Sequence, residues 1–158
     1  MVAGQGRGAF AGGRKIAAEI SFGLSLDSCW IVYEHRDVPP NQYKASSFWG
    51  VDGGTGQFFA YVFDNFHGNR AKRRLRTRRT EERRSDEVRQ LVSNGWKDGK
   101  LLLSGSAYIP SVGLYFEHFL YERLSDTQFK MTYETSRDGI VWQLGDWLVF
   151  TRNGAAGK

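Results

Sequence analysis

The chain has 158 residues and a mass of 18.0 kDa, which suffices for one domain with a core and not for two ordinary ones. Aromatic residues make up 15% of the chain and glycine occurs 19 times, so the composition favours β-structure. No stretch approaches the roughly 20 apolar residues of a membrane-spanning helix, so we expect no membrane span.

Residues 1–15 are rich in glycine and also hold Arg7, Arg14 and Lys15. They lack the continuous apolar stretch of about 7–15 residues that a secretory signal contains. We therefore predict a disordered leader over 1–15, one β-barrel domain over 16–152 and a flexible tail over 153–158. The single cysteine, Cys29, cannot form a disulfide within the chain, which fits the reducing cytoplasm. We expect a cytoplasmic protein.

Short runs of alternating apolar and polar residues follow, each bounded by turn residues. The glycines of the turn at 52–56 tolerate positive φ, as a hairpin requires. In the run 128–135, polar residues alternate strictly with Phe129, Met131 and Tyr133, which predicts a polar outer face and an apolar inner face. The predicted strands span residues 16–26, 29–35, 43–51, 57–64, 101–108, 114–124, 128–135 and 140–152.

A basic segment interrupts this pattern. Residues 70–92 hold ten basic and four acidic side chains, so this segment accounts for the whole net charge of +5. Because the charge is local, the sequence pI of about 9.5 is no evidence that the whole surface is shaped for nucleic acid. We predict a basic loop insert over 69–93, with a possible short helix over 80–92.

Strands joined in chain order would leave two unpaired edges in a flat sheet, and curling into a barrel pairs them. The fold class that we predict is therefore all-β. Its architecture is an up-and-down antiparallel β-barrel, closed or incompletely closed, with the basic insert attached.

Several turn and strand motifs resemble those of a known family. The matching residues are Phe48–Asp52, Thr55–Gln57, Phe63–Phe66, Gly95–Lys100, Ser104–Gly105, Phe129, Tyr133–Glu134, Ser136, Asp138–Gly139, Trp142 and Phe150–Arg152. Over roughly residues 26–152 the chain thereby resembles a bacterial calycin-type family of lipocalin-like β-barrels of unassigned function. The resemblance implies the fold and leaves the chemistry open. The family usually opens with a Gly-x-Trp strand and has a short connection where this chain carries the basic insert.

A barrel of this size can hold one small molecule among its inward side chains. We therefore predict a binding protein for a small hydrophobic ligand. His118 shares one side of its strand with Leu114, Phe116 and Leu120, so it is a candidate polar anchor inside the cavity. The candidate cavity residues are Trp49, Phe59, Tyr61, Phe116, His118, Tyr133 and Trp142.

Two other functions stay open. An enzyme could use the same cavity, with His118 or Tyr133 transferring a proton to or from an apolar substrate, although no motif identifies a catalytic residue. Nucleic acid or another polyanion could bind the arginines of the insert in a salt-sensitive way. No cofactor and no metal are expected, since the three histidines lack metal-ligand spacing. The candidate polyanion-binding residues are Arg73, Arg74, Arg76, Arg78 and Arg79.

Overall fold

The computed structural model describes residues 1–66, 89–109 and 112–154, and the elements in these residues are all β-strands. The strands are β1 (Val2–Phe10), β2 (Lys15–Ser25), β3 (Trp30–Asp37), β4 (Lys44–Val51), β5 (Phe58–Asp64), β6 (Arg89–Ser93), β7 (Trp96–Lys97), β8 (Lys100–Ile109), β9 (Gly113–Arg123), β10 (Gln128–Ser136) and β11 (Gln143–Arg152). Among the described residues there is no helix of the length and hydropathy that a membrane crossing requires.

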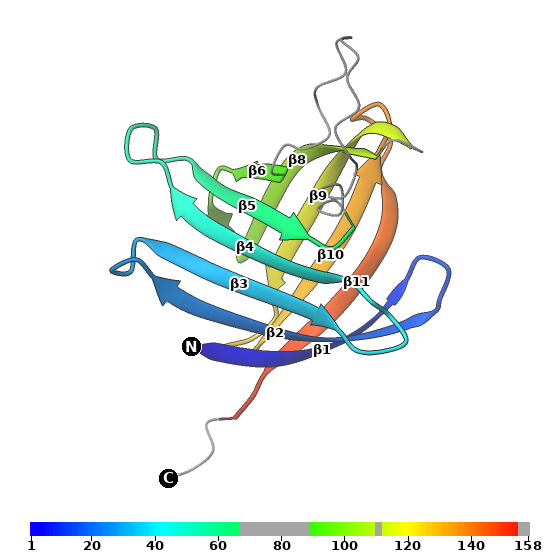
Figure 1. Cartoon of the computed structure of the whole chain (residues 1–158), viewed down its shortest axis with the longest axis horizontal. Helices are drawn as coiled ribbons and strands as arrows, with labels where there is room; N and C mark the ends of the chain where they lie inside the picture. Colours follow the sequence, from blue (N-terminus) through cyan, green and yellow to red (C-terminus); the bar gives the residue numbers. More distant parts are fainter. Residues whose placement is uncertain (67–88, 110–111, 155–158) are drawn as a thin grey trace, which may run out of the picture.

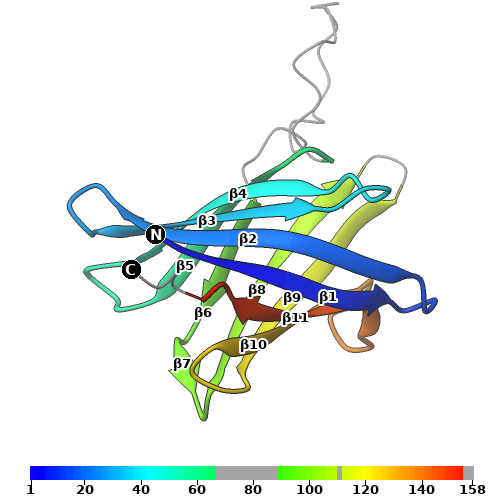
Figure 2. The same ribbon diagram turned by 90° about the horizontal axis from the view of Figure 1, so that it is seen from below.

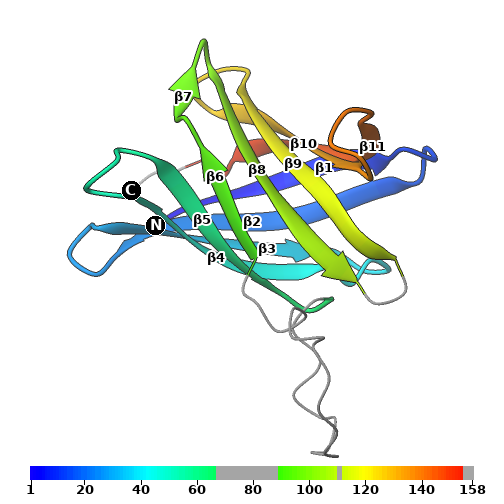
Figure 3. The same ribbon diagram turned by 90° about the horizontal axis from the view of Figure 1, so that it is seen from above.

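The strands pair antiparallel in chain order from β1 to β6 and from β8 to β11, and β11 pairs with β1 (Figure 1). A further pairing of β6 with β8 closes the sheet into a ten-stranded up-and-down barrel, while β7 only extends one edge of β8. Figures 2 and 3 show strands β2 to β4 on one side of the barrel, inclined to strands β8 to β10 on the other. The predicted fold class is confirmed, in its closed form.

Two local predictions are also confirmed. Met131 and Tyr133 of β10 point into the barrel, and the polar residues that alternate with them, Lys130, Thr132 and Glu134, are on the opposite face of the strand, because successive strand residues face opposite sides. The turn between β4 and β5 is the predicted hairpin: the Asp52 carboxylate accepts hydrogen bonds from the backbone N–H groups of Gly54 and Thr55, and Gly56 has a φ of 70°.

Residues 2–10, which were predicted to be disordered, form β1 between β2 and β11. Three glycines at alternate positions, Gly4, Gly6 and Gly8, leave the middle of the inner face of β1 without side chains, and the ring of Phe150 fills the space over Gly6. A Cβ atom at Gly6 would lie 2.3 Å from that ring, and one at Gly8 would lie 1.7 Å from the carbonyl oxygen of Trp147. The glycines are therefore required by close packing of the strand against β11.

The insert is shorter than predicted. Residues 89–93 form β6, which pairs with β5 and β8, so the prediction of a loop or helix through these residues is wrong. Arg89 is buried inside the barrel. The rest of the basic segment, residues 67–88, lies outside the described residues. The closing seam joins Leu91 to Gly105 and Val92 to Ser104, and its glycine gives the Leu91 side chain room.

Aromatic rings fill the barrel toward the end that holds the N-terminus. Their rings form a chain of contacts. The ring centroid of Trp49 lies 5.6 Å from that of Phe22 and 5.3 Å from that of Tyr121, both in edge contacts, and Phe129 stacks on Phe150 at a centroid distance of 5.1 Å. This layer separates the middle of the barrel from that end. We call it the aromatic plug, and its members are Phe22, Tyr33, Trp49, Tyr121, Phe129 and Phe150.

Candidate functional site

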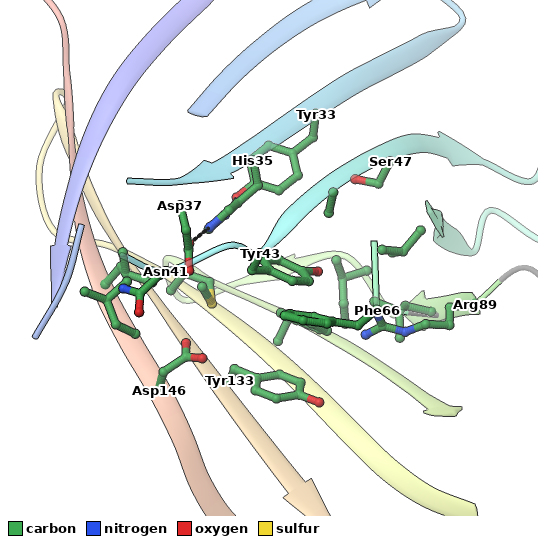
Figure 4. A pocket seen from close by; sticks show the side chains of 18 of the residues that line it. Tyr33, His35, Asp37, Asn41, Tyr43, Ser47, Phe66, Arg89, Tyr133 and Asp146 are labelled. Carbon is green, nitrogen blue, oxygen red and sulfur yellow. Dashed lines mark hydrogen bonds and ion pairs between the residues drawn. The ribbon is translucent and has the colours of Figure 1, made fainter. Parts of the chain in front are cut away.

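A cavity of about 500 Å³ lies inside the barrel beyond the aromatic plug, and Tyr33, Trp49 and Tyr121 of the plug line it. Figure 4 shows some of its lining side chains, Tyr33 among them. Much of the wall around it is apolar. The apolar residues of the wall are Ile16, Ala45, Ala60, Val62, Leu91, Leu103, Met131 and Leu148. At the rim, away from the plug, lie Phe10, Arg14, Pro40, Asn41, Gln42 and Phe66.

Strand β3 directs a row of three polar side chains into the cavity. Tyr33, His35 and Asp37 share the inner face because they stand two residues apart. The Tyr33 hydroxyl lies 3.0 Å from His35 Nδ1, and His35 Nε2 lies 2.9 Å from Asp37 Oδ1 (Figure 4). With a proton on Nε2, the imidazole donates to Asp37 and accepts from the Tyr33 hydroxyl. This arrangement satisfies both nitrogens of a histidine that is only 6% exposed.

Asp146 of β11 lines the same part of the cavity as Asp37 (Figure 4). Burial raises the pKa of Asp146 to about 6; the negative charge of Asp37 adds to this rise, and His35 opposes it. Within the described residues, no side chain donates a hydrogen bond to the Asp146 carboxyl group or forms a salt bridge with it. When this group ionises, its charge is therefore poorly compensated.

A buried ion cluster stands at another side of the cavity. Arg89 at the start of β6 binds Glu117 of β9 through two guanidinium nitrogens, with Nε 2.9 Å from Oε1, and binds Asp64 of β5 through the third. Burial lowers the pKa of Arg89, but the charge of Glu117 and its hydrogen bonds outweigh burial and raise it. The guanidinium therefore stays charged. Its charge is met by two carboxylates that are themselves 9% exposed or less.

The tyrosines around the cavity are neutral hydrogen-bonding groups. Burial raises the pKa values of Tyr33, Tyr43, Tyr121 and Tyr133 well above that of a free phenol. The Tyr133 hydroxyl donates to Glu117 at 3.4 Å. Tyr43 stacks against Phe66 at a centroid distance of 5.7 Å. These side chains therefore offer ring faces and hydroxyl groups to a ligand, and no phenolate at neutral pH.

The structure places two of the seven predicted cavity residues, Trp49 and Tyr133, in the cavity lining. Phe59 and Tyr61 are instead on the outer face of β5, where both pack against Trp30. Their prediction was wrong because both faces of that strand are apolar, and the inner one carries Phe58, Ala60 and Val62.

Phe116, His118 and Trp142 also lie outside the cavity. The ring of His118 stacks on the ring of Trp142 on the outer face of β9, and the two ring centroids are 3.3 Å apart. The predicted alternation along this strand holds, but the inner face is the one that carries Tyr115, Glu117, Phe119 and Tyr121. The assignment of His118 to the cavity is therefore wrong: a strand with apolar residues on both faces gives no signal for which face is inside.

Sequence reasoning missed the polar groups of the cavity. The spacing Tyr33-x-His35-x-Asp37 was a visible signal, because a strand must bring such residues to one face. The Arg89 cluster had no local signal, since its members lie far apart in the sequence. Asp146 had none either, because the charged groups that act on it, Asp37 and His35, belong to another strand. The five candidate polyanion-binding arginines fall within 67–88, outside the described residues.

Comparison with known proteins finds no family model that matches the chain and no curated protein with significant sequence similarity to it. In the part of the chain that the structure describes, no group of three or more histidine, cysteine, aspartate or glutamate side chains is arranged to hold a metal ion. The functional argument therefore rests on the cavity.

Proposed function

We propose that this protein is a binding module that holds one small, mainly apolar molecule inside its barrel. The observation that carries the proposal is the cavity of about 500 Å³, which has aromatic rings of the plug in its lining, an apolar wall and a few polar groups that converge on one region. Ligand sites in proteins typically enclose about 300–1,000 Å³ and combine apolar walls with a few oriented polar groups.

The barrel topology agrees with membership of the bacterial calycin-type family that the turn motifs suggest, and this membership is part of the proposal. Lipocalin-like barrels of this size enclose room for one small ligand. Fold likeness alone does not assign an activity, so the family adds support to the cavity argument and does not replace it.

Of the two candidate proton-transfer groups of the enzyme alternative, one lies outside the cavity. His118 is on the outer face of the barrel, stacked on Trp142, and cannot reach a molecule in the cavity. Tyr133 does line the cavity, but burial, together with the charge of Glu117, raises its pKa and disfavours proton loss at neutral pH. Binding without turnover is therefore the function that we propose.

The test uses N-phenyl-1-naphthylamine, a neutral probe that fluoresces in apolar surroundings. Ala45 lines the cavity, and its neighbour Ser46 lies on the outer face of β4, which gives a matched pair of variants. We expect saturable binding of one probe per chain, strongly reduced in Ala45→Phe because the ring fills the cavity, and retained in Ser46→Phe.

Circular dichroism must show that both variants keep the β-sheet spectrum of the wild type. Equal probe binding by the two folded variants would place the probe elsewhere and refute the proposal. The absence of saturable probe binding by the folded wild-type protein would also refute the proposal. Native mass spectrometry of the purified protein adds an independent measurement, because a molecule that co-purifies in the cavity would be lost in Ala45→Phe only.

A further inference from the structure

Among the residues that the structure describes, acidic groups outnumber basic ones in the barrel interior. Four of their carboxyl groups, those of Asp37, Asp64, Glu117 and Asp146, stand inside with one buried guanidinium, that of Arg89. Arg89 binds the carboxylates of Asp64 and Glu117, whose two negative charges offset its single positive charge. The remaining two carboxyl groups, Asp37 and Asp146, line the cavity directly.

These two groups lack a full complement of partners. Asp37 accepts the His35 Nε2 hydrogen through Oδ1, and no described residue donates a hydrogen bond to its Oδ2. The carboxyl group of Asp146 receives no hydrogen bond from the described residues. Arg14, the other cation in the lining, lies over the ring of Phe10 at 4.3 Å and makes no salt bridge to either carboxylate.

The groups around this acidic pair suit a positive charge. Tyr43 and Phe66 line the cavity with stacked rings, and Tyr133 adds a third ring from β10. The negative faces of such rings attract cations. A carboxylate ligand would meet both aspartates, whereas an ammonium or amidinium group can bind them by charge-assisted hydrogen bonds.

We propose, on the basis of the proposed binding function, that the ligand is a hydrophobic amine or amidine whose cationic nitrogen pairs with Asp146 and Asp37. The apolar part of the molecule then extends along the wall toward Trp49 in the aromatic plug. The cavity thereby selects organic cations over fatty acids and other organic anions of the same length.

The test compares three probes of equal chain length at pH 7.5: decylamine, decanol and decanoate. Each is titrated against the protein loaded with N-phenyl-1-naphthylamine, and displacement gives its dissociation constant. We expect decylamine to bind about tenfold more tightly than decanol or better, and decanoate to bind most weakly.

Asp146→Asn removes one of the two charges with little change in size. This variant should weaken decylamine binding by about tenfold to a hundredfold and leave decanol binding unchanged. Glu19→Gln, which removes a carboxylate from an exposed position on β2, is the matched control and should change neither value.

The outcomes separate this inference from the function on which it rests. If decanol displaces the probe and decylamine binds no better, or if decanoate binds best, the cation preference is refuted while the binding function stands. An amine preference that is unchanged in Asp146→Asn would also refute it. If neither the naphthylamine probe nor any decyl compound binds the folded protein, the binding function itself fails.

Discussion

Replacement of Asp146 by asparagine should stabilise the ligand-free protein, and by an amount that grows with pH. Burial and the charge of Asp37 raise the pKa of Asp146 from 3.8 to about 6. A carboxyl group with a raised pKa favours folding below its unfolded-state pKa, and this contribution is lost as the pH rises through the folded-state value. Near pH 8 the ionised group therefore costs about 3 kcal/mol, at 1.36 kcal/mol for each pKa unit.

The free energy of unfolding, measured by urea denaturation of wild-type protein and Asp146→Asn between pH 4 and pH 8, tests this reasoning. The gain in the variant should rise from about 0.5 kcal/mol near pH 4 to about 3 kcal/mol at pH 8. The amide itself can change the free energy of unfolding by an amount that does not depend on pH, and such a change leaves the slope of the difference against pH unaltered. Glu19→Gln should show no such slope. A difference that stays flat across this range, or that falls with pH, would refute the buried-charge account of Asp146.

Three further changes test other parts of the structure. Gly8→Ala should destabilise the barrel by about 1–3 kcal/mol in thermal or urea unfolding, because its Cβ would meet β11 backbone, whereas Gly12→Ala, in open space, should not. Arg89→Met should cost about 3–5 kcal/mol, since it leaves Glu117 and a second carboxylate buried without their cation; a loss below 1 kcal/mol would contradict the cluster. His118→Ala should leave probe binding unchanged, and a tenfold loss would contradict its outward position.

The parts of the fold that the sequence predicted are those with a strong local pattern. Alternation along β10 and the glycine-containing turn after Asp52 each depend on residues within one strand or one hairpin, so periodicity and turn chemistry are sufficient to find them. The barrel then follows from the need to pair the edges of a meander.

The missed elements depend on neighbours that are distant in the sequence. β1 has no apolar alternation because Phe150 of β11 supplies the packing over Gly6. β6 begins with Arg89, a charged residue at the end of a highly charged segment, which is buried because Asp64 and Glu117, 25 and 28 residues away, neutralise it. A single sequence contains no local sign of either arrangement.

The candidate site shows the same division. Trp49 and Tyr133 were found because large rings at inward positions are the commonest lining of a cavity. His118 was placed inside because it shares one side of β9 with the apolar residues Leu114, Phe116 and Leu120, which were taken to face the cavity. The structure contradicts this, because the opposite face of β9 is the inner one, where Glu117 is buried together with Arg89.

The pairing of β1 with β11 has a consequence for how the protein is made. β1 leaves the ribosome well before Phe150 and the rest of β11, which follow some 140 residues later by the register of the two strands. Until then the nascent sheet keeps an open edge along its glycine-lined first strand. The barrel therefore closes only after translation of β11, and the chain needs protection from edge-to-edge association during that interval.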